Sequence, residues 1–159
     1  MPFPFDSQTF QKQLSSDKLV SEQLLLLLEQ EQQALSDRDA DQVDQLLEKK
    51  VPLLEQLEQS SKIRQHWAQQ MGNSSDEQAW NKIVEQLGGE TISKQWHELK
   101  SLFAKVQKQN EINGKLLSRH QKTVSRLLDL MRGKTAAPNL YNASGYSSAQ
   151  AHSNNIGQA

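Results

Sequence analysis

The sequence predicts an all-α fold: an elongated, antiparallel, coiled-coil-like bundle of three long helices and one short helix. Apolar residues recur at helical spacing along stretches that contain almost no glycine or proline. Only 35% of the residues are hydrophobic, whereas glutamine, glutamate and lysine, which favour helices, are abundant. A slender bundle with a narrow apolar seam needs fewer core residues than a sandwich or a barrel, so this composition favours helices throughout.

The first long helix is expected before the polar turn at residues 36–39. Its apolar stripe consists of Phe10, Leu14, Leu24, Leu28 and Leu35, and three polar residues interrupt it: Asp17, Ser21 and Glu31. Leucine fills every position from 24 to 28, so this segment is apolar on every face. Such a helix is usually covered from more than one side. The leucine run should therefore lie beneath two neighbouring helices, or leave some leucines for a partner.

The second long helix is expected to start after a cap at Asp39 or Asp41 and to stop at Gly72. Its apolar stripe runs through Val43, Leu46, Leu47, Val51, Leu53, Leu54, Leu57, Ile63, Trp67 and Met71. Pro52 lies inside the stripe and removes one backbone hydrogen-bond donor, so a kink is expected there. The spacing of Ser74 and Glu77 suits a capping box, which predicts a short helix that ends at residues 88–89.

The third long helix is predicted as one unbroken element from Glu90 or Thr91 to about Gly133. Its seam would be about 60 Å long at 1.5 Å per residue, and nine of its twelve members are apolar. The members are Ile92, Trp96, Leu99, Phe103, Val106, Asn110, Asn113, Leu117, His120, Val124, Leu127 and Met131. Because the three polar members fall in its second half, we expect that half of the seam to lack a complete apolar lining.

The end of the sequence differs from the rest in composition. After Lys134 it contains no acidic residue, lysine or arginine, and it consists largely of Ala, Ser, Asn, Gly and Gln. Such a segment buries too little surface to order itself. We therefore expect a helical bundle over residues 1–134 and a disordered tail over residues 135–159. The tail carries Leu140, Tyr141, Tyr146 and Ile156, and either a spacer or a docking peptide would fit that pattern.

Several features bear on the compartment. The absence of cysteine excludes disulfides, thiolate zinc sites and thiol catalysis. The first residues lack the basic region and the apolar run of a secretory signal. The longest apolar run, at residues 24–28, is far shorter than the roughly 20 residues that span a bilayer. The sequence thus predicts a soluble, cytoplasmic protein without membrane insertion.

Charge is unevenly distributed along the chain. Residues 1–93 contain 16 acidic and 8 basic residues, whereas residues 94–159 contain 3 acidic and 10 basic residues. Packing of a basic helix beside acidic helices of the same fold explains this asymmetry. A nucleic-acid surface is the less favoured interpretation, because the basic residues are spread along the helix without a dense cluster or a known reading motif.

No motif of catalysis or cofactor binding is present. The sequence lacks a phosphate loop, a dinucleotide fingerprint and a nucleophile elbow, and its four histidines lack zinc-site spacing. Asp37, Asp39, Asp41 and Glu48 match four positions of a calcium-binding EF-hand loop, but Gln42 replaces the glycine that the loop needs. Helix capping explains the same acids. We therefore expect no enzyme, no catalytic residue, no metal and no cofactor, but a protein that works by binding.

A bundle with an incompletely covered stripe has a specific consequence. An amphipathic helix from another chain can lie in the uncovered part of the stripe. Alternatively, a second copy of the same chain can cover it, which would make the protein a structural coiled-coil adaptor that self-associates through its apolar seam. Periodicity alone does not separate these two hypotheses.

The order of elements and one central motif resemble the FlgN-type flagellar export chaperones. An asparagine and a glycine followed by an aliphatic pair are matched by Asn113, Gly114, Leu116 and Leu117. The basic–aliphatic continuation is matched by Arg119, Lys122, Val124, Leu127, Leu128 and Met131, and the final tyrosine and glycine by Tyr141 and Gly145. The resemblance covers residues 5–146 as a layout. Tyr146 and the residues after it have no counterpart in the family pattern.

The resemblance implies a cytoplasmic chaperone that binds hook-associated proteins, the subunits of the hook–filament junction. Such a protein would hold a terminal helical segment of the subunit, prevent premature assembly and deliver it to the flagellar type III export gate. The family places cargo binding in the C-terminal part of the chain, which corresponds here to Asn113, Gly114, Leu117, Val124, Leu127, Leu128 and Met131. Tyr141 matches the tail tyrosine that docks at the export gate.

Overall fold

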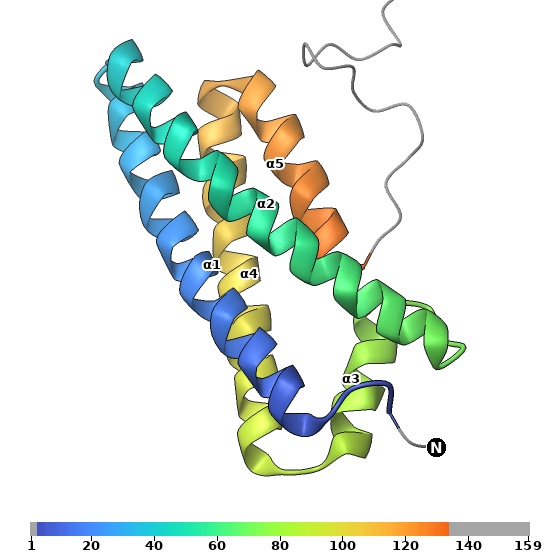
Figure 1. The fold of residues 1–159 in the computed structure, drawn as a ribbon. Helices are drawn as coiled ribbons and strands as arrows, with labels where there is room; N and C mark the ends of the chain where they lie inside the picture. The colour runs from blue at the N-terminus through green and yellow to red at the C-terminus, as the bar shows by residue number, and fades with distance from the viewer. Residues whose placement is uncertain (1–2, 134–159) are drawn as a thin grey trace, which may run out of the picture.

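The computed structural model describes residues 3–133, apart from the side chains of residues 118–124, and within that range it contains five helices and no strand. They are α1 (Ser7–Ser36), α2 (Ala40–Gln70), α3 (Glu77–Leu87), α4 (Glu90–Leu116) and α5 (Ser118–Met131). The predicted all-α bundle is confirmed. Three of the helices are long and α3 is short, as expected, but α5 is an additional element (Figure 1).

Helices α1, α2, α4 and α5 enclose the core, and α3 closes one end of it. Helix α1 packs against both α2 and α4, while α5 packs against α2 and α4 from the other side. Helix α3 packs on α4 at the end of the bundle where the chain begins (Figure 1). None of the helices in residues 3–133 is long and apolar enough to cross a membrane.

The prediction of one unbroken helix across residues 90–133 is wrong. The chain leaves helical geometry at Leu117, where φ is −150° and ψ is 88°, and α5 then turns back along α4 (Figure 1). Gly114, three residues earlier, lowers the helix propensity of this turn. Helical periodicity continues across the break because α4 and α5 both turn an apolar stripe toward the same core. Spacing alone does not distinguish a long helix from such a hairpin.

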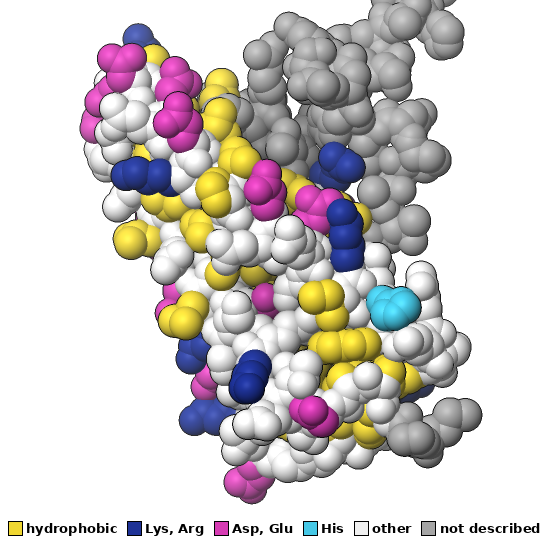
Figure 2. Space-filling model, viewed as in Figure 1, with side chains coloured by type: hydrophobic (Ala, Val, Ile, Leu, Met, Phe, Trp, Pro, Cys, Tyr) yellow, Lys and Arg dark blue, Asp and Glu magenta, His cyan; other side chains and the backbone are white. Residues whose placement is uncertain are grey.

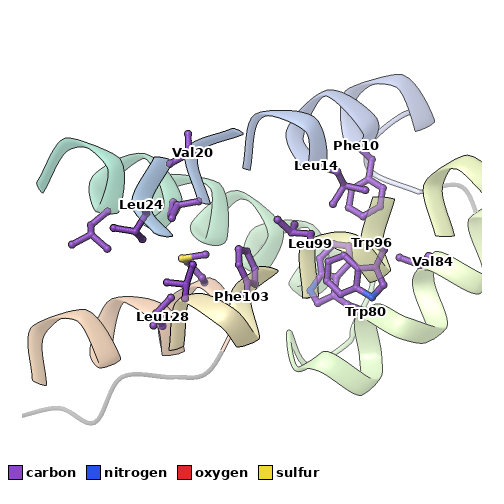
Figure 3. Packing of buried hydrophobic residues seen from close by; sticks show 14 of the residues in the cluster. Phe10, Leu14, Val20, Leu24, Trp80, Val84, Trp96, Leu99, Phe103 and Leu128 are labelled. Atoms are coloured by element: carbon purple, nitrogen blue, oxygen red, sulfur yellow. The ribbon is translucent and has the colours of Figure 1, made fainter. Parts of the chain in front are cut away.

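The apolar core runs along the inside of the bundle and is richest in aromatic rings near the start of α1. Phe10 stacks on Trp80 with ring centroids 5.7 Å apart, and Trp80 lies 6.2 Å from Trp96. Figure 3 shows these rings at one end of the cluster, and Leu24, Phe103 and Leu128 toward the other. Because rings and aliphatic side chains from all five helices share this cluster, the short helices α3 and α5 belong to the same folding unit as the long ones.

The leucine run at residues 24–28 lies beneath two neighbours, as predicted. Leu24 and Leu28 are fully buried where α1 contacts α2 and α4. Leu25 and Leu27 are partly buried, and Leu26 is 55% exposed. One leucine of the five is therefore left on the outer face of α1.

Aspartate side chains cap the first turns of three helices, and Asp6 does so for α1 by accepting from the backbone N–H of Thr9 at 2.6 Å. Asp39 caps α2 by accepting a hydrogen bond from the backbone N–H of Gln42 at 3.1 Å, as predicted. For α3 the expected capping box from Ser74 is wrong, because Asp76 is the cap and accepts from the backbone N–H of Ala79 at 2.7 Å. That hydrogen bond lowers the pKa of Asp76.

Two further expectations concern α2. The helix continues across Pro52, which lies inside it. Glu48 lies more than one turn inside α2, so the residues that resemble an EF-hand loop have helical geometry from Ala40 onward. In the described part of the chain, no group of three or more His, Asp or Glu side chains is arranged to hold a metal ion.

Candidate partner-binding region

Asn113, which we expected on an incompletely lined seam, is a buried and fully bonded residue. Its side-chain amide donates to the carbonyl oxygen of Leu28 at 2.7 Å and to Oε1 of Glu31 at 3.0 Å. Its own Oδ1 accepts from Gln109 Nε2 at 3.0 Å. Gly114 beside it is buried as well. Both residues lie inside the bundle rather than on an open surface, and Asn113 joins α4 to α1.

A buried ion pair extends this polar layer to α2. Lys50 Nζ contacts Glu31 Oε2, and the two side chains are 0% and 1% exposed. Burial of a charge is tolerated only when it is paired and hydrogen-bonded, and the Asn113 amide supplies an additional donor to Glu31. Lys50 was missed in the sequence although it occupies a stripe position, four residues from both Leu46 and Leu54. A charged residue at a core position is the signal that would have identified it.

A second buried ion pair lies at the other end of α5. Arg64 Nη1 donates to Asp17 Oδ2 at 2.5 Å, and Nη2 donates to the carbonyl oxygen of Met131 at 3.2 Å. The same guanidinium also reaches Gln13 Oε1 at 3.1 Å. Carbonyl groups in the last turn of a helix lack intrahelical partners, so Arg64 caps α5 while it pairs α2 with α1.

The α5 residues assigned to cargo binding face the interior. Leu128 and Met131 are 2% and 3% exposed, and Leu127 is partly buried against the same cluster. The side chain of Val124 lies outside the described residues. Our expectation that the second half of the seam stays uncovered is therefore wrong, because α5 folds back and covers α4 itself.

Leu117 lies in a different place, at the apex of the bundle. It is partly buried against Ala34, Val43 and Leu46, in a small cluster separate from the main core. Leu117 also lines an open pocket of about 420 Å³ between the α1–α2 turn and the α4–α5 turn. Acidic side chains gather around the α1–α2 turn at this apex (Figure 2).

The sequence-predicted residues therefore occupy three places rather than one continuous surface. Asn113 and Gly114 lie inside the bundle, Leu117 lies at the apex, and Leu127, Leu128 and Met131 lie on the inner face of α5. Tyr141 lies outside the described residues. The large apolar side chains that are exposed in the described chain are scattered singly, as is normal for a protein surface: Leu19, Leu26, Val51, Ile63 and Leu116.

Comparison with known proteins agrees with this architecture. The family model of the FlgN protein matches residues 1–149. The chain belongs to the FlgN family. The crystal structure of a protein described as a flagella synthesis protein, FlgN, from Pseudomonas aeruginosa has a similar fold, with a TM-score of 0.69 and 30% sequence identity. The match covers 83% of this chain and 100% of that one. No curated protein matches the chain.

Membership of the FlgN family assigns this protein to flagellum biogenesis as a chaperone. The family is one of flagellar chaperones and is not known for enzymatic activity. A chaperone acts by covering surface of another protein.

Proposed function

We propose that this member of the FlgN family is a type III flagellar export chaperone that binds hook-associated proteins, prevents their premature assembly and delivers them to the export gate. Family membership supports the general role. The observation that supports the location of the cargo surface is helix α5, whose apolar face is docked on the bundle while its first residue lacks a side-chain cap. A short helix attached in this way is suited to exchange its own bundle contacts for contacts with a cargo helix.

Cargo contact by Leu127, Leu128 and Met131 requires α5 to leave the groove between α2 and α4. Exposing a buried leucine or methionine costs roughly 1.5–3 kcal/mol. A cargo helix that covers both the freed residues and the groove would recover this free energy. The proposed cargo segment is therefore an amphipathic helix with an apolar stripe, because only such a segment matches both surfaces.

The polar contacts around α5 are compatible with its release. When Met131 leaves, Arg64 loses one carbonyl partner but keeps Asp17 and Gln13. No buried charge is orphaned by the movement, and the ion pair between Lys50 and Glu31 does not involve α5. The bundle of α1, α2 and α4 would thus retain its two buried ion pairs with cargo bound.

We assign roles to the other predicted site residues from their positions in the chain. Val124 continues the stripe of α5, one turn before Leu127 and Leu128. Leu117 is the non-helical residue about which α5 would turn, and Asn113 with Gly114 ends the fixed part of α4. Tyr141 is proposed to dock at the export gate, so the Tyr141→Ala variant should retain cargo but fail to deliver it in an export assay. Loss of cargo capture in that variant would contradict this division of roles.

Replacement of Leu128 by Ala tests the cargo surface. We expect weaker capture of a purified hook-associated protein in a pull-down assay with the Leu128→Ala variant, because part of the proposed contact is removed. Leu14→Ala is the matched control, since Leu14 is equally buried but lies on α1 and is not part of α5. Capture that is unchanged or tighter in Leu128→Ala would show that Leu128 only holds α5 closed and does not bind cargo.

Self-association through the apolar seam, the alternative interpretation of the sequence, has less support. It requires a seam that faces outward. In the described residues, α5 covers the part of the seam that would have been available. We therefore propose no second function.

A further inference from the structure

A pocket of about 150 Å³ lies between α3, α4 and the end of α5. Trp80, Trp96, Phe103 and Met131 form its apolar wall, and Lys100 and Glu77 contribute polar groups. An apolar cavity of this size accommodates a benzene ring. The pocket is therefore large enough for one aromatic side chain and too small for a helix.

The polar atoms around the pocket suit an aromatic side chain that carries a polar group at its end. The indole N–H groups are already bonded: Trp80 donates to Ser75 Oγ at 3.0 Å, and Trp96 donates to Asn81 Oδ1 at 2.7 Å. The two indoles consequently offer their carbon faces to an occupant. Lys100 Nζ lies 3.8 Å from Glu77 Oε1, so both a donor and an acceptor stand at the rim. A phenol matches this wall, since its ring is apolar and its hydroxyl both donates and accepts.

The chain itself leaves the bundle at this pocket. Arg132 lines the pocket, and Gly133 follows with a φ of +78°. A Cβ atom at Gly133 would overlap the carbonyl oxygen of Ser75. Ser75 is also the residue that accepts the Trp80 hydrogen bond. Gly133, the last described residue, therefore lies directly beside the indole wall.

We propose that the side chain of Tyr141, from this chain's own C-terminal segment, occupies the pocket. Tyr141 follows Gly133 by eight residues, which span up to roughly 26 Å when extended and can fold back onto a site beside their origin. Tyr146 follows by thirteen residues, and loop closure at that distance is about twofold less probable. The shorter loop therefore favours Tyr141 over Tyr146.

The docking has one consequence for regulation, which rests on the proposed function. A tyrosine held in the pocket is covered, so a partner that recognises Tyr141 would have to compete with the indole wall. The docking itself depends only on the pocket and the sequence, and it is tested on the free protein, without cargo or export gate. Failure of the docking and failure of the proposed function would thus appear in separate experiments.

Nuclear magnetic resonance of the indole N–H groups tests the docking in the full chain. The protein has three tryptophans, and the Trp67→Phe variant identifies the signal of Trp67, which is not part of the pocket. We expect Tyr141→Ala to shift the signals of Trp80 and Trp96 and to leave that of Trp67 in place. The matched control Tyr146→Ala should leave all three signals in place. Unchanged Trp80 and Trp96 signals in Tyr141→Ala, or equal shifts in both variants, would overturn the proposal.

Disulfide trapping gives a second readout, because the natural sequence contains no cysteine. Cysteines are placed at Ala104, which lines the pocket and is exposed, and at Asn142, next to Tyr141. We expect the disulfide between them to form about tenfold faster when Tyr141 is present than in the Tyr141→Ala background, given the free energy of burying an aromatic ring. Equal trapping rates would overturn the proposal.

Discussion

Replacement of Lys50 by Met breaks one of the two buried ion pairs in the described part of the bundle. Lys50 and Glu31 are both almost fully excluded from solvent, and methionine fills much of the volume of the lysine stem. The variant therefore leaves the Glu31 carboxylate buried without its cation. Loss of one partner of a buried ion pair costs about 3–5 kcal/mol. That cost is a large share of the roughly 5–15 kcal/mol by which domains are stable.

Urea unfolding followed by helical circular dichroism measures this cost. We expect Lys50→Met to lose about 3–5 kcal/mol, and the double variant Glu31→Gln with Lys50→Met to recover at least half of the loss. Recovery is expected because glutamine carries no charge, while its Oε1 can still accept from Asn113. A loss below about 1 kcal/mol in Lys50→Met, or a double variant no more stable than the single one, would refute the buried pair.

Two further predictions concern glycine and aspartate at helix ends. Gly133→Ala should lower the free energy of unfolding by more than the roughly 1–2 kcal/mol that a left-handed conformation costs, because the added Cβ would also overlap Ser75. The control in urea unfolding is Gly72→Ala, which has a similar φ of +73° but open space around it. Equal losses in the two variants would contradict the overlap. The pKa of Asp76 is lowered by its hydrogen bond from the Ala79 backbone N–H, so its contribution is present above the unfolded value of 3.8 and disappears as the pH falls through the lower folded pKa. Asp76→Asn, which keeps a neutral cap, should therefore lose less stability than the natural protein between pH 4 and pH 2 in acid titrations of the unfolding midpoint, and identical pH profiles would count against this cap.

Local chemistry in the sequence was sufficient to place most helix boundaries. Gly72 and Gly88 have positive φ and end α2 and α3, where few residues other than glycine fit. Asp39 caps α2 because its side chain reaches a free backbone N–H. These features depend on residues within one turn of one another, so they can be read without knowledge of the fold.

The turn between α4 and α5 could not be predicted in the same way. Leu117 is neither a glycine nor a proline, and the apolar stripe passes through it without a change of spacing. Folding back is favoured by the groove that α2 and α4 provide for Leu128 and Met131. That groove exists only once residues distant in the sequence have come together.

The buried polar contacts among Asn113, Glu31 and Lys50 could not be predicted from the sequence for the same reason. Asn113 interrupts an apolar stripe, which is equally consistent with an open surface and with a polar contact inside the bundle. Its partners Leu28 and Glu31 lie 85 and 82 residues away, and Lys50 comes from a third helix. Only the packing of α1 against α4 decides between the two interpretations, so the sequence singled out Asn113 but could not show that its side chain is buried.

Locking α5 in place tests most directly whether its inner face is the cargo surface. Asn110 Nδ2 of α4 lies 3.4 Å from Ser125 Oγ of α5, so cysteines at these two positions face each other in a chain that has no others, and a disulfide between them would hold α5 on α4. Binding of a purified hook-associated protein is then measured with the disulfide formed and again after reduction. We expect the oxidised protein to fail to bind and reduction to restore binding. Equal binding in both states would contradict it.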